Sequence, residues 1–513
     1  MSDSTGQRRP AHRVALIILF LIITVVVTSL SARLVADVSR WWRPDGFAYL
    51  AATAVMLVLS GVLINAVPKV VGDLWRWDGS VAAAAGRLVA VLNGPRNRIG
   101  IPVVVVALAV GSYFLVPTEE LEPGELVILS ADDVSPEDPR NTLLEQWNAI
   151  HPDNSARFVK APGDTDEQFE HMINDAKDGG RNEADIYLLD VVWMTRFIDD
   201  GYIRPLDRSR LSARDLDDFV DKVRRTGERE GGKGELWSLP LNTDVGLVYY
   251  RTDIPGVDEP ADWDDHSGPA ARTAPVATHA FQMSGEMATI TSLEAIWAAG
   301  GQVVQEDGRI SPTADGPRAR FDEEDLTGLR KLNTALNDPA SFPGDPEPEK
   351  AGARDAVNQF VEGRALYMRN WAVAHKQLTN RQRELDDKGI TFRAVAPPTP
   401  SVLGGQNLAI SAKNDTPRAA QALIEFMTSA QSQLILSEIG GFAPTRDSVY
   451  ERLKGEQFRS IRAALQDAWP RPSIRCYTEW SQEFRDGVKD VVGPDDEVSD
   501  DTAEKLTGDC PEG

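Results

Sequence analysis

From residue 125 onward, short apolar segments alternate with amphipathic ones, and this alternation limits the possible folds more than any other feature of the sequence. Three strands are predicted, at residues 126–131, 156–160 and 185–190. Three helices are predicted, at residues 141–150, at 191–199 and from Thr165, which has Gln168 as its capping-box partner. Such repetition predicts an α/β fold with a parallel sheet covered by helices on both faces. Ligands of such sheets bind beyond the carboxyl ends of the strands, where this chain has Asp132, Asp133, Asp190 and Trp193.

Residues 236–251, LWSLPLNTDVGLVYYR, are predicted to carry the chain from one sheet to another. Pro240 lacks an amide hydrogen and Asn242 favours turns, so we expect a turn between two strands, with a change of partner there. Asp244 lies at this crossing, near two tyrosines and a tryptophan. A carboxylate beside aromatic rings suits a polar ligand with a flat apolar face, such as a sugar. The alternative is a solvated aspartate in a turn.

The first 118 residues are predicted to be a membrane anchor. Apolar runs at about 14–32, 47–67 and 99–116 each approach the roughly 20 residues that cross a bilayer. A cleaved signal peptide is the alternative for the first run, but no clear cleavage site follows it. With the N-terminus inside the cell, eight basic residues of the flanking segments are cytoplasmic and three are outside. The anchor therefore predicts a multi-pass protein of the cell membrane whose large domain is extracellular.

Charge and residue usage exclude several classes of function. The whole chain has a net charge of −24, made up of +3 over residues 1–124 and −27 over the remainder. An acidic domain argues against nucleic acid as a partner. The histidines and cysteines lack the spacing of metal ligands, and no nucleophile triad, P-loop or zinc motif occurs, so we expect no metal, no cofactor and no enzyme activity.

Five segments together resemble one family. They are LLDVVWMTRFIDDGYIRPLD, LPLNTDVGLVYYRTD, AVNQFVEGRALYMRNWAVAH, LGGQNLAIS and GGFAPTRDSVY. In this order and spacing they resemble the extracellular solute-binding proteins of ABC importers, of the trehalose/maltose type (family 1) found in actinobacteria. The resemblance implies a two-lobed fold like that of periplasmic binding proteins (type II), closing on a sugar, with no catalytic residue.

The resemblance also implies how the chain divides. The solute-binding domain is expected at 125–513. One lobe should contain about 125–240 and 400–430, and the other about 245–395 and 431–490. An acidic tail follows to residue 513.

The family's binding residues are carried over position by position. Its sugar-contacting aspartate and tryptophan correspond to Asp244 and Trp371, while Asp190 and Trp193 correspond to the cleft rim. The family's paired glycines, which let the backbone approach the ligand, correspond to Gly404 and Gly405. Arg446 belongs to the segment that resembles the loop closing the far lobe. Two positions depart from the family, since Gln406 stands where many relatives have an aromatic residue and Glu286 is the remnant of a Tyr-Glu-Gly-Leu segment.

Alternatives remain for several of these residues. Trp371 could be a core residue, and for Trp193, on a helix beside Met194 and Phe197, packing is favoured over ligand contact. Asp132 and Asp133 could belong to a solvated turn, with at most one of them contacting ligand. Cys476 and Cys510 are expected to form a disulfide if the domain is extracellular, and two free thiols are the alternative.

The function that follows is capture of a sugar or oligosaccharide for ABC permease subunits. A membrane sensor with a binding-protein-like domain is the alternative, because a three-span anchor is unusual for an importer's binding protein. A glycosidase would need two carboxylates at a defined separation, which the sequence does not reveal.

Overall fold

The computed structural model describes residues 121–491 apart from residues 132, 134, 178–179, 181–182, 230–233, 262–276, 281, 311–320 and 338–352. The three predicted membrane spans lie outside the described residues. Within the described part of the chain, no helix is both long enough and apolar enough to cross a bilayer.

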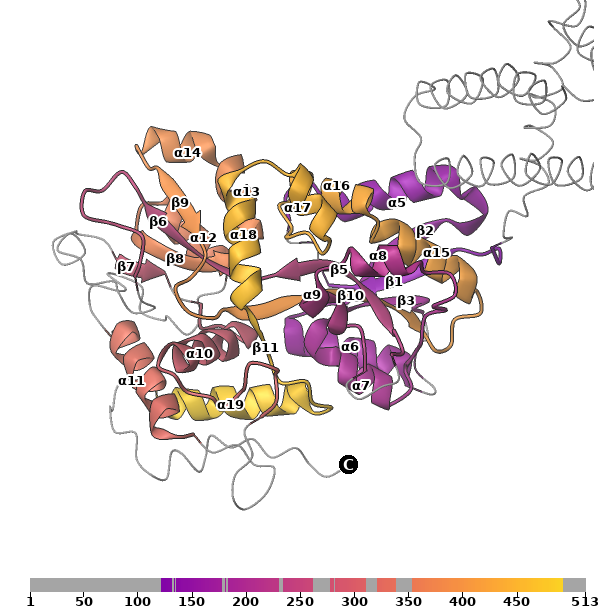
Figure 1. Cartoon of the computed structure of the whole chain (residues 1–513), viewed down its shortest axis with the longest axis horizontal. Coiled ribbons are helices and arrows are strands. Elements are labelled where there is room, and N and C mark those ends of the chain that lie inside the picture. The colour runs from indigo at the N-terminus through magenta and orange to yellow at the C-terminus, as the bar shows by residue number, and fades with distance from the viewer. Residues whose placement is uncertain are drawn as a thin grey trace, which may run out of the picture. The chain divides into compact units, whose positions relative to one another are not determined.

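Seven strands of the described chain form the first sheet (Figure 1). β1 (Leu126–Ser130) lies between β2 (Ala156–Lys160) and β3 (Ile186–Asp190), and both pairings are parallel, as the alternating pattern predicts. The long strand β10 (Val402–Ser411) runs antiparallel to β3 and also pairs with β4 (Ile203–Arg204), β5 (Ser238–Asp244) and β11 (Trp469–Pro470). The sheet is therefore mixed rather than wholly parallel.

Helices cover both faces of this sheet. On one face the buried side chains of α5 (Pro139–Ile150), α15 (Pro417–Met427) and α16 (Ala430–Gly440) form a core with alternate residues of β1, β3 and β10. On the other face α6 (Thr165–Ala176) and α7 (Met194–Asp199) do the same. Shorter helices are η1 (Pro152–Asn154), η2 (Val191–Trp193), α8 (Ala213–Asp217), α9 (Asp221–Arg225) and α17 (Asp447–Arg452).

The start of α6 differs from the capping box predicted at Thr165. Asp164 is the N-cap, and its Oδ1 accepts a hydrogen bond from the Glu167 amide at 3.0 Å. Gln168 donates to the Gly163 carbonyl at 2.8 Å. The carboxylate one residue earlier takes the capping position because a side-chain acceptor at Asp164 reaches the third amide of the helix.

The second sheet contains β7 (Ala277–Ala280), β8 (Ala365–Trp371), β6 (Gly246–Arg251) and β9 (Phe392–Val395), in that order. Packed with it are α12 (Ala353–Val361), α13 (Val373–Asn380), α14 (Gln382–Asp387) and α18 (Glu456–Asp467). A further group, α10 (Glu286–Ala298), α11 (Glu323–Asn337) and α19 (Tyr477–Val491), lies together at the lower edge of Figure 1. Two sheets with separate helix sets agree with the two-lobed fold.

The crossing between the sheets occurs later than the sequence predicts. β5 runs straight through Pro240 to Asp244, and only Val245 separates it from β6 in the second sheet. Asn407 faces Pro240 while Gln406 faces Asn242, so Leu241 is the extra residue of a bulge. A bulge tolerates a proline without an amide hydrogen, which explains why the predicted turn is replaced by a continuous strand.

Helix α16 corrects the predicted division at residue 431. It contacts α5 of the first lobe and β5 of the first sheet, and Gln433 Nε2 donates to the Leu241 carbonyl at 2.6 Å. Residues 430–440 therefore pack mainly with the first lobe, while Leu434 also contributes to the core around the second sheet. Their apolar periodicity is the same in either lobe, so it could not decide between them.

We expect Gly405→Ala to destabilise the fold by about 1–3 kcal/mol, because Gly405 has a φ of +131° and a Cβ there would lie 2.5 Å from the Asn242 carbonyl oxygen. Gly404→Ala is the matched control, since its Cβ would make only ordinary contacts, 3.4 Å or longer. Urea unfolding of the full-length variants, followed by tryptophan fluorescence, measures the difference. Equal stability of the two variants would contradict this prediction.

Candidate ligand-binding site

The structure brings Asp244, Trp371 and Gly404 together where the two sheets meet. Asp244 ends β5 and pairs with Gly404 of β10, while Trp371 ends β8 and pairs with Gly246 at the start of β6. The point that a Cβ at Gly404 would occupy lies 3.4 Å from the Asp244 Cβ and 3.6 Å from two ring carbons of Trp371. The carboxylate and the indole therefore both border Gly404, which has no side chain to cover them.

Trp371 is partly exposed and held from both ends of its own backbone. Its amide donates to Asn370 Oδ1 at 2.8 Å, and its carbonyl accepts from the Tyr249 hydroxyl at 2.9 Å. The guanidinium of Arg369 lies 4.2 Å from the ring centroid, a cation–π contact. The ring is therefore fixed in orientation but not fully covered, unlike a core tryptophan.

A buried ion pair supports this ring from behind. Arg369 Nε and Nη2 donate to the two carboxylate oxygens of Glu294 on α10 at 2.9 and 2.6 Å. Glu294 Oε1 also accepts from the Val402 amide at 2.9 Å, which ties the pair to β10. A bidentate pair of this kind restricts both side chains, so Arg369 is a rigid platform for Trp371.

Asp244 is electrostatically unusual. Its pKa is raised to about 7, mainly by burial and also by the neighbouring Asp190, although Arg140, a hydrogen bond from Asn242 and Arg369 oppose the rise. Asn242 Nδ2 donates to Asp244 Oδ2 at 3.2 Å, whereas Asp244 Oδ1 and Asn242 Oδ1 have no hydrogen-bond partner among the described residues. Two buried acceptors at one place leave room for donors from a ligand.

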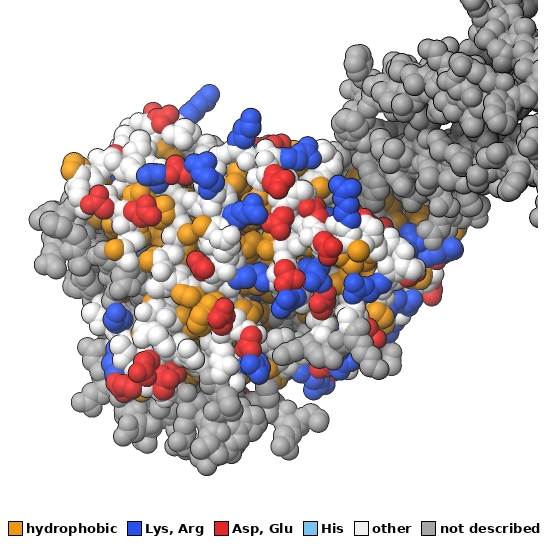
Figure 2. Space-filling model, viewed as in Figure 1, with side chains coloured by type: hydrophobic (Ala, Val, Ile, Leu, Met, Phe, Trp, Pro, Cys, Tyr) orange, Lys and Arg blue, Asp and Glu red, His pale blue; other side chains and the backbone are white. Residues whose placement is uncertain are grey.

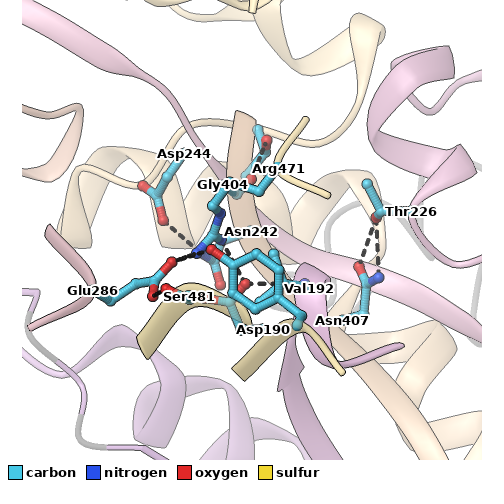
Figure 3. Close-up of polar contacts among 12 residues, drawn as sticks. Asp190, Val192, Thr226, Asn242, Asp244, Glu286, Gly404, Asn407, Arg471 and Ser481 are labelled. Atoms are coloured by element: carbon cyan, nitrogen blue, oxygen red, sulfur yellow. Dashed lines mark hydrogen bonds and ion pairs between the residues drawn. The ribbon is translucent and has the colours of Figure 1, made fainter. Parts of the chain in front are cut away.

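Asp190 lies near Asp244 and is paired with an arginine that the sequence did not single out. Arg471, just after β11, donates to Asp190 Oδ1 at 2.7 Å and to Glu286 Oε1 at 2.8 Å (Figure 3). Glu286 also accepts from Ser481 at 2.7 Å, from Arg485 at 3.1 Å and from the Tyr477 hydroxyl. All these contacts of Glu286 are with other residues of the chain, which favours a structural role, and its predicted contact with the ligand stays a prediction.

Two further predicted site residues also lie in packing positions. Trp193 is 4% exposed and lies in the core beside α6, its ring 5.6 Å from that of Phe169. Arg446 is stacked 3.9 Å from the ring centroid of Phe219 and donates to the Thr428 carbonyl at 2.6 Å. These positions favour packing for Trp193 and a loop-anchoring role for Arg446. Sequence spacing places both near strand ends or loops but does not say which way a side chain points.

Of the two aspartates that follow β1, the structure describes Asp133. Asp132 lies outside the described residues. Asp133 Oδ1 accepts from the amide and hydroxyl of Ser135 at 2.8 and 2.6 Å, so one oxygen is used by the local turn. Its Oδ2 lies 3.7 Å from Arg140 Nε.

Arg140 is the main residue that sequence reasoning missed. It lies in the first turn of α5, which follows two residues in the left-handed region, Glu137 (φ 66°) and Asp138 (φ 46°). Its Nη2 donates to Gln406 Oε1 at 2.6 Å, across 266 residues of sequence. An arginine after a proline at a helix start normally points to solvent, so no local signal marks it as buried.

A separate groove of about 1320 Å³ borders this site beyond Arg471. It is lined from both lobes, for example by Thr195, Lys222, Gln302 and Trp469. Lys222 donates to the carbonyls of Gln466 and Ala468, and Arg229 pairs with Asp199 at 2.9 Å. Among the described residues that line this groove, Arg471 Nε is the one buried side-chain nitrogen or oxygen without a hydrogen bond. The groove therefore offers a ligand fewer unpaired buried polar atoms than the Asp244 site does.

Among the described residues, neither the face seen in Figure 2 nor any group of metal-binding side chains indicates a second site. On the face seen in Figure 2, basic and acidic side chains are interspersed with hydrophobic ones, as on surfaces in contact with water. In the described part of the chain, no cluster of three His, Cys, Asp or Glu residues could hold a metal ion. Cys476 is buried ahead of α19, and Cys510 lies outside the described residues, so their pairing stays a prediction.

Comparison with known families decides the class of protein. The family described as bacterial extracellular solute-binding protein matches residues 153–460, more than half of the chain. The chain belongs to this family. Its members bind solutes and are not enzymes, which confirms the prediction that the chain has a binding and not a catalytic function.

Individual relatives agree with this membership. The chain is 26% identical to a probable ABC transporter-binding protein of Deinococcus radiodurans over an alignment of 363 residues. The alignment covers 66% of this chain and 82% of the relative. Maltose-bound MalE3 of T. maritima has a TM-score of 0.62 at 22% identity, covering 74% of this chain and 97% of its own. The GacH receptor of Streptomyces glaucescens, solved with acarbose, has a TM-score of 0.62 at 21% identity, with 75% and 97% covered. UgpB of Mycobacterium tuberculosis, solved with glycerophosphocholine, has a TM-score of 0.59 at 18% identity, with 75% and 97% covered.

Asp244 should make stability depend on pH. An unfolded aspartate ionises near pH 4, whereas the folded pKa is about 7, so the folded chain holds more protons between these values and loses stability as the pH rises through them. We expect Asp244→Asn to remove this loss. Its stability relative to the parent should therefore be greater at about pH 8 than at about pH 5, by about 1.4 kcal/mol or more, since one pKa unit corresponds to that energy.

The measurement is urea unfolding of both full-length chains across this pH range. Asp207→Asn is the control, because Asp207 is an exposed aspartate whose pKa is lowered by its bonds to Ser209. A pH-independent difference between Asp244→Asn and the parent would show that Asp244 titrates normally.

Proposed function

We propose that this solute-binding protein captures a neutral sugar or other polyol between its two lobes. The observation that carries the proposal is that the unpartnered Asp244 Oδ1 and the partly exposed Trp371 ring lie side by side at Gly404, which has no side chain to cover them. A carboxylate accepts hydrogen bonds from hydroxyl groups, and an indole covers the apolar C–H face of a pyranose ring. These are the two chemical faces that a sugar presents.

The relatives support this class of ligand without fixing its identity. Structures of the same fold hold maltose, acarbose and, in UgpB, glycerophosphocholine. The trehalose/maltose type remains part of the proposal. Gln406 in place of an aromatic residue, and the internal bonding of Glu286, favour a sugar bound with fewer ring contacts than in that type.

We further propose that the N-terminal 118 residues anchor the protein in the cell membrane and that it delivers its solute to ABC permease subunits. The three apolar runs and their flanking basic residues support the anchor. The Deinococcus relative, named as a probable ABC transporter-binding protein, supports the transport role. The same anchor is what keeps a sensing role as the second candidate. In either case the Cys476–Cys510 disulfide is expected to tie the C-terminal tail to the start of α19.

We expect Asp244→Ala and Trp371→Ala each to weaken sugar binding by at least about tenfold, or about 1.4 kcal/mol, because each removes one of the two complementary faces. Isothermal calorimetry of the full-length chain with maltose, trehalose, maltotetraose and glycerophosphocholine measures this. Asp207→Ala, which changes an exposed aspartate of the same lobe, should bind like the parent. Unchanged affinity in both site variants would refute the site, and no binding of any of these compounds would refute the sugar proposal.

The topology is tested separately. Lys454 is exposed after α17, so a cysteine at this position should react in intact cells with a maleimide that cannot cross membranes. The parent chain, with only its two native cysteines, gives the background labelling. Reaction of Lys454→Cys only after cell lysis would place the domain inside the cell.

A further inference from the structure

Arg140 is buried but incompletely bonded. It is 3% exposed, and the hydrogen bond of its Nη2 to Gln406 is accompanied only by a longer approach of Nε to Asp133, at 3.7 Å. Arg140 Nε and Nη1 have no hydrogen-bond partner among the described residues. A buried guanidinium with unused donors is costly to leave in that state, so an acceptor from a ligand would stabilise it.

This guanidinium lies beside the acceptor already assigned to the ligand. The positive charge of Arg140 lowers the pKa of the Asp244 carboxyl. In return, the carboxylates of Asp133 and Asp244 favour the charged form of Arg140. Gln406, which holds Arg140, is two residues beyond Gly404 on β10 and therefore on the same face of the strand. Gln406 also pairs with Asn242 across the sheet, and Asn242 donates to Asp244. The unused donors of Arg140 and the unused acceptor of Asp244 are thus held by two paired residues of neighbouring strands, close to Gly404.

The surrounding charges determine what kind of group fits there. Asp133 and Asp244 already compensate the charge of Arg140, and Asp190 is paired with Arg471. No uncompensated positive charge is therefore left for an anionic ligand group, whereas a hydroxyl can accept from Arg140 and donate to Asp244. Two adjacent hydroxyls of a neutral ring satisfy both residues without adding charge.

Gln406 has a different part in this arrangement from the one its sequence position implies. Its Oε1 accepts from Arg140 Nη2 at 2.6 Å, and the ring of Phe442 lies 5.2 Å from the guanidinium carbon. The amide and the ring together fix the direction of the guanidinium. An aromatic residue at position 406 could not supply this acceptor.

We propose that Arg140 is a ligand-binding residue that donates to a hydroxyl oxygen of the solute, next to the hydroxyl held by Asp244, and that Gln406 positions it. This inference rests on the proposed function, because it assumes a polyol at Asp244. It assigns recognition of a neutral vicinal diol to an Arg140–Asp244 pair and selects against ligands that carry an anion at this position.

The test uses the full-length chain and calorimetry with maltose, trehalose and maltotetraose, each compared with its monodeoxy derivatives. Arg140→Met keeps the length of the side chain but removes its donors, and we expect it to lower affinity at least tenfold. Arg251→Met is the matched control, because Arg251 is also a buried arginine, but it lies at the end of β6 far from Val245 and donates to Asp253 at 2.7 Å. It should lower thermal stability and leave the affinity of the folded protein unchanged.

The deoxy sugars separate ligand contact from a structural effect. The parent should bind one monodeoxy derivative, the one that lacks the hydroxyl contacted by Arg140, at least tenfold more weakly than the intact sugar. Arg140→Met should bind that derivative and the intact sugar with about equal affinity. If every deoxy derivative loses the same affinity in both proteins, Arg140 does not contact the solute. Binding of the intact sugars with equal affinity by the parent and Arg140→Met overturns this inference alone, whereas no binding by the parent overturns the sugar proposal and this inference with it.

Gln406→Ala gives a second variant, at a half-buried position, in case Arg140→Met folds poorly. Acting through Arg140, it should reduce affinity severalfold in the parent and weaken the same deoxy discrimination, but it should have no further effect in the Arg140→Met background. Additive losses in the double variant would mean that Gln406 contacts the solute directly and would overturn its positioning role. An affinity of Gln406→Ala equal to that of the parent would do the same.

Discussion

Strand β10 depends on partners along both of its edges, and the rest of the architecture follows from how these are supplied. β3 pairs with it on one side, and β5, arriving from a distant part of the sequence, pairs with it on the other. The approach of β5 is close enough at Gly405 that a side chain there would collide with the backbone. Because β5 leads through Val245 directly into β6, this pairing also fixes where the second sheet begins.

Three buried arginines, Arg140, Arg369 and Arg471, surround the candidate site at Asp244 and Trp371. Arg369 and Arg471 have carboxylate partners with good geometry, Glu294 for the first and both Asp190 and Glu286 for the second. Breaking such a pair by removing one member leaves a buried charge without compensation, so these residues form a rigid frame. Arg369 Nη1 and Arg471 Nε also lack a hydrogen-bond partner among the described residues, but both arginines donate to a carboxylate at 2.6 or 2.7 Å. Arg140 differs, because its carboxylate neighbour Asp133 is 3.7 Å away. This difference in carboxylate pairing separates the arginines that hold the fold from the one available to a solute.

Much of the first lobe could be predicted from the sequence, since the strands β1, β2 and β3 and the buried stripe of α6 follow from local periodicity. The meeting of Asp244, Trp371 and Gly404 was expected from the family resemblance, and the structure brings the three together. Local patterns could not reveal the continuous course of β5 through Pro240, because the bulge depends on β10, more than 160 residues away. For the same reason, local patterns could not predict the bonding of Glu286 to Arg471, 185 residues away, or of Arg140 to Gln406, 266 residues away.

The single residue between β5 and β6 has a mechanical consequence. Asp244 and Gly246, the partner of Trp371, flank Val245, so both groups lie beside this connection between the sheets. A rotation of one sheet against the other about Val245 would move groups beside it little and groups far from it most. A solute bound by Asp244 and Trp371 would then keep nearly the same contacts in the open and the closed arrangement.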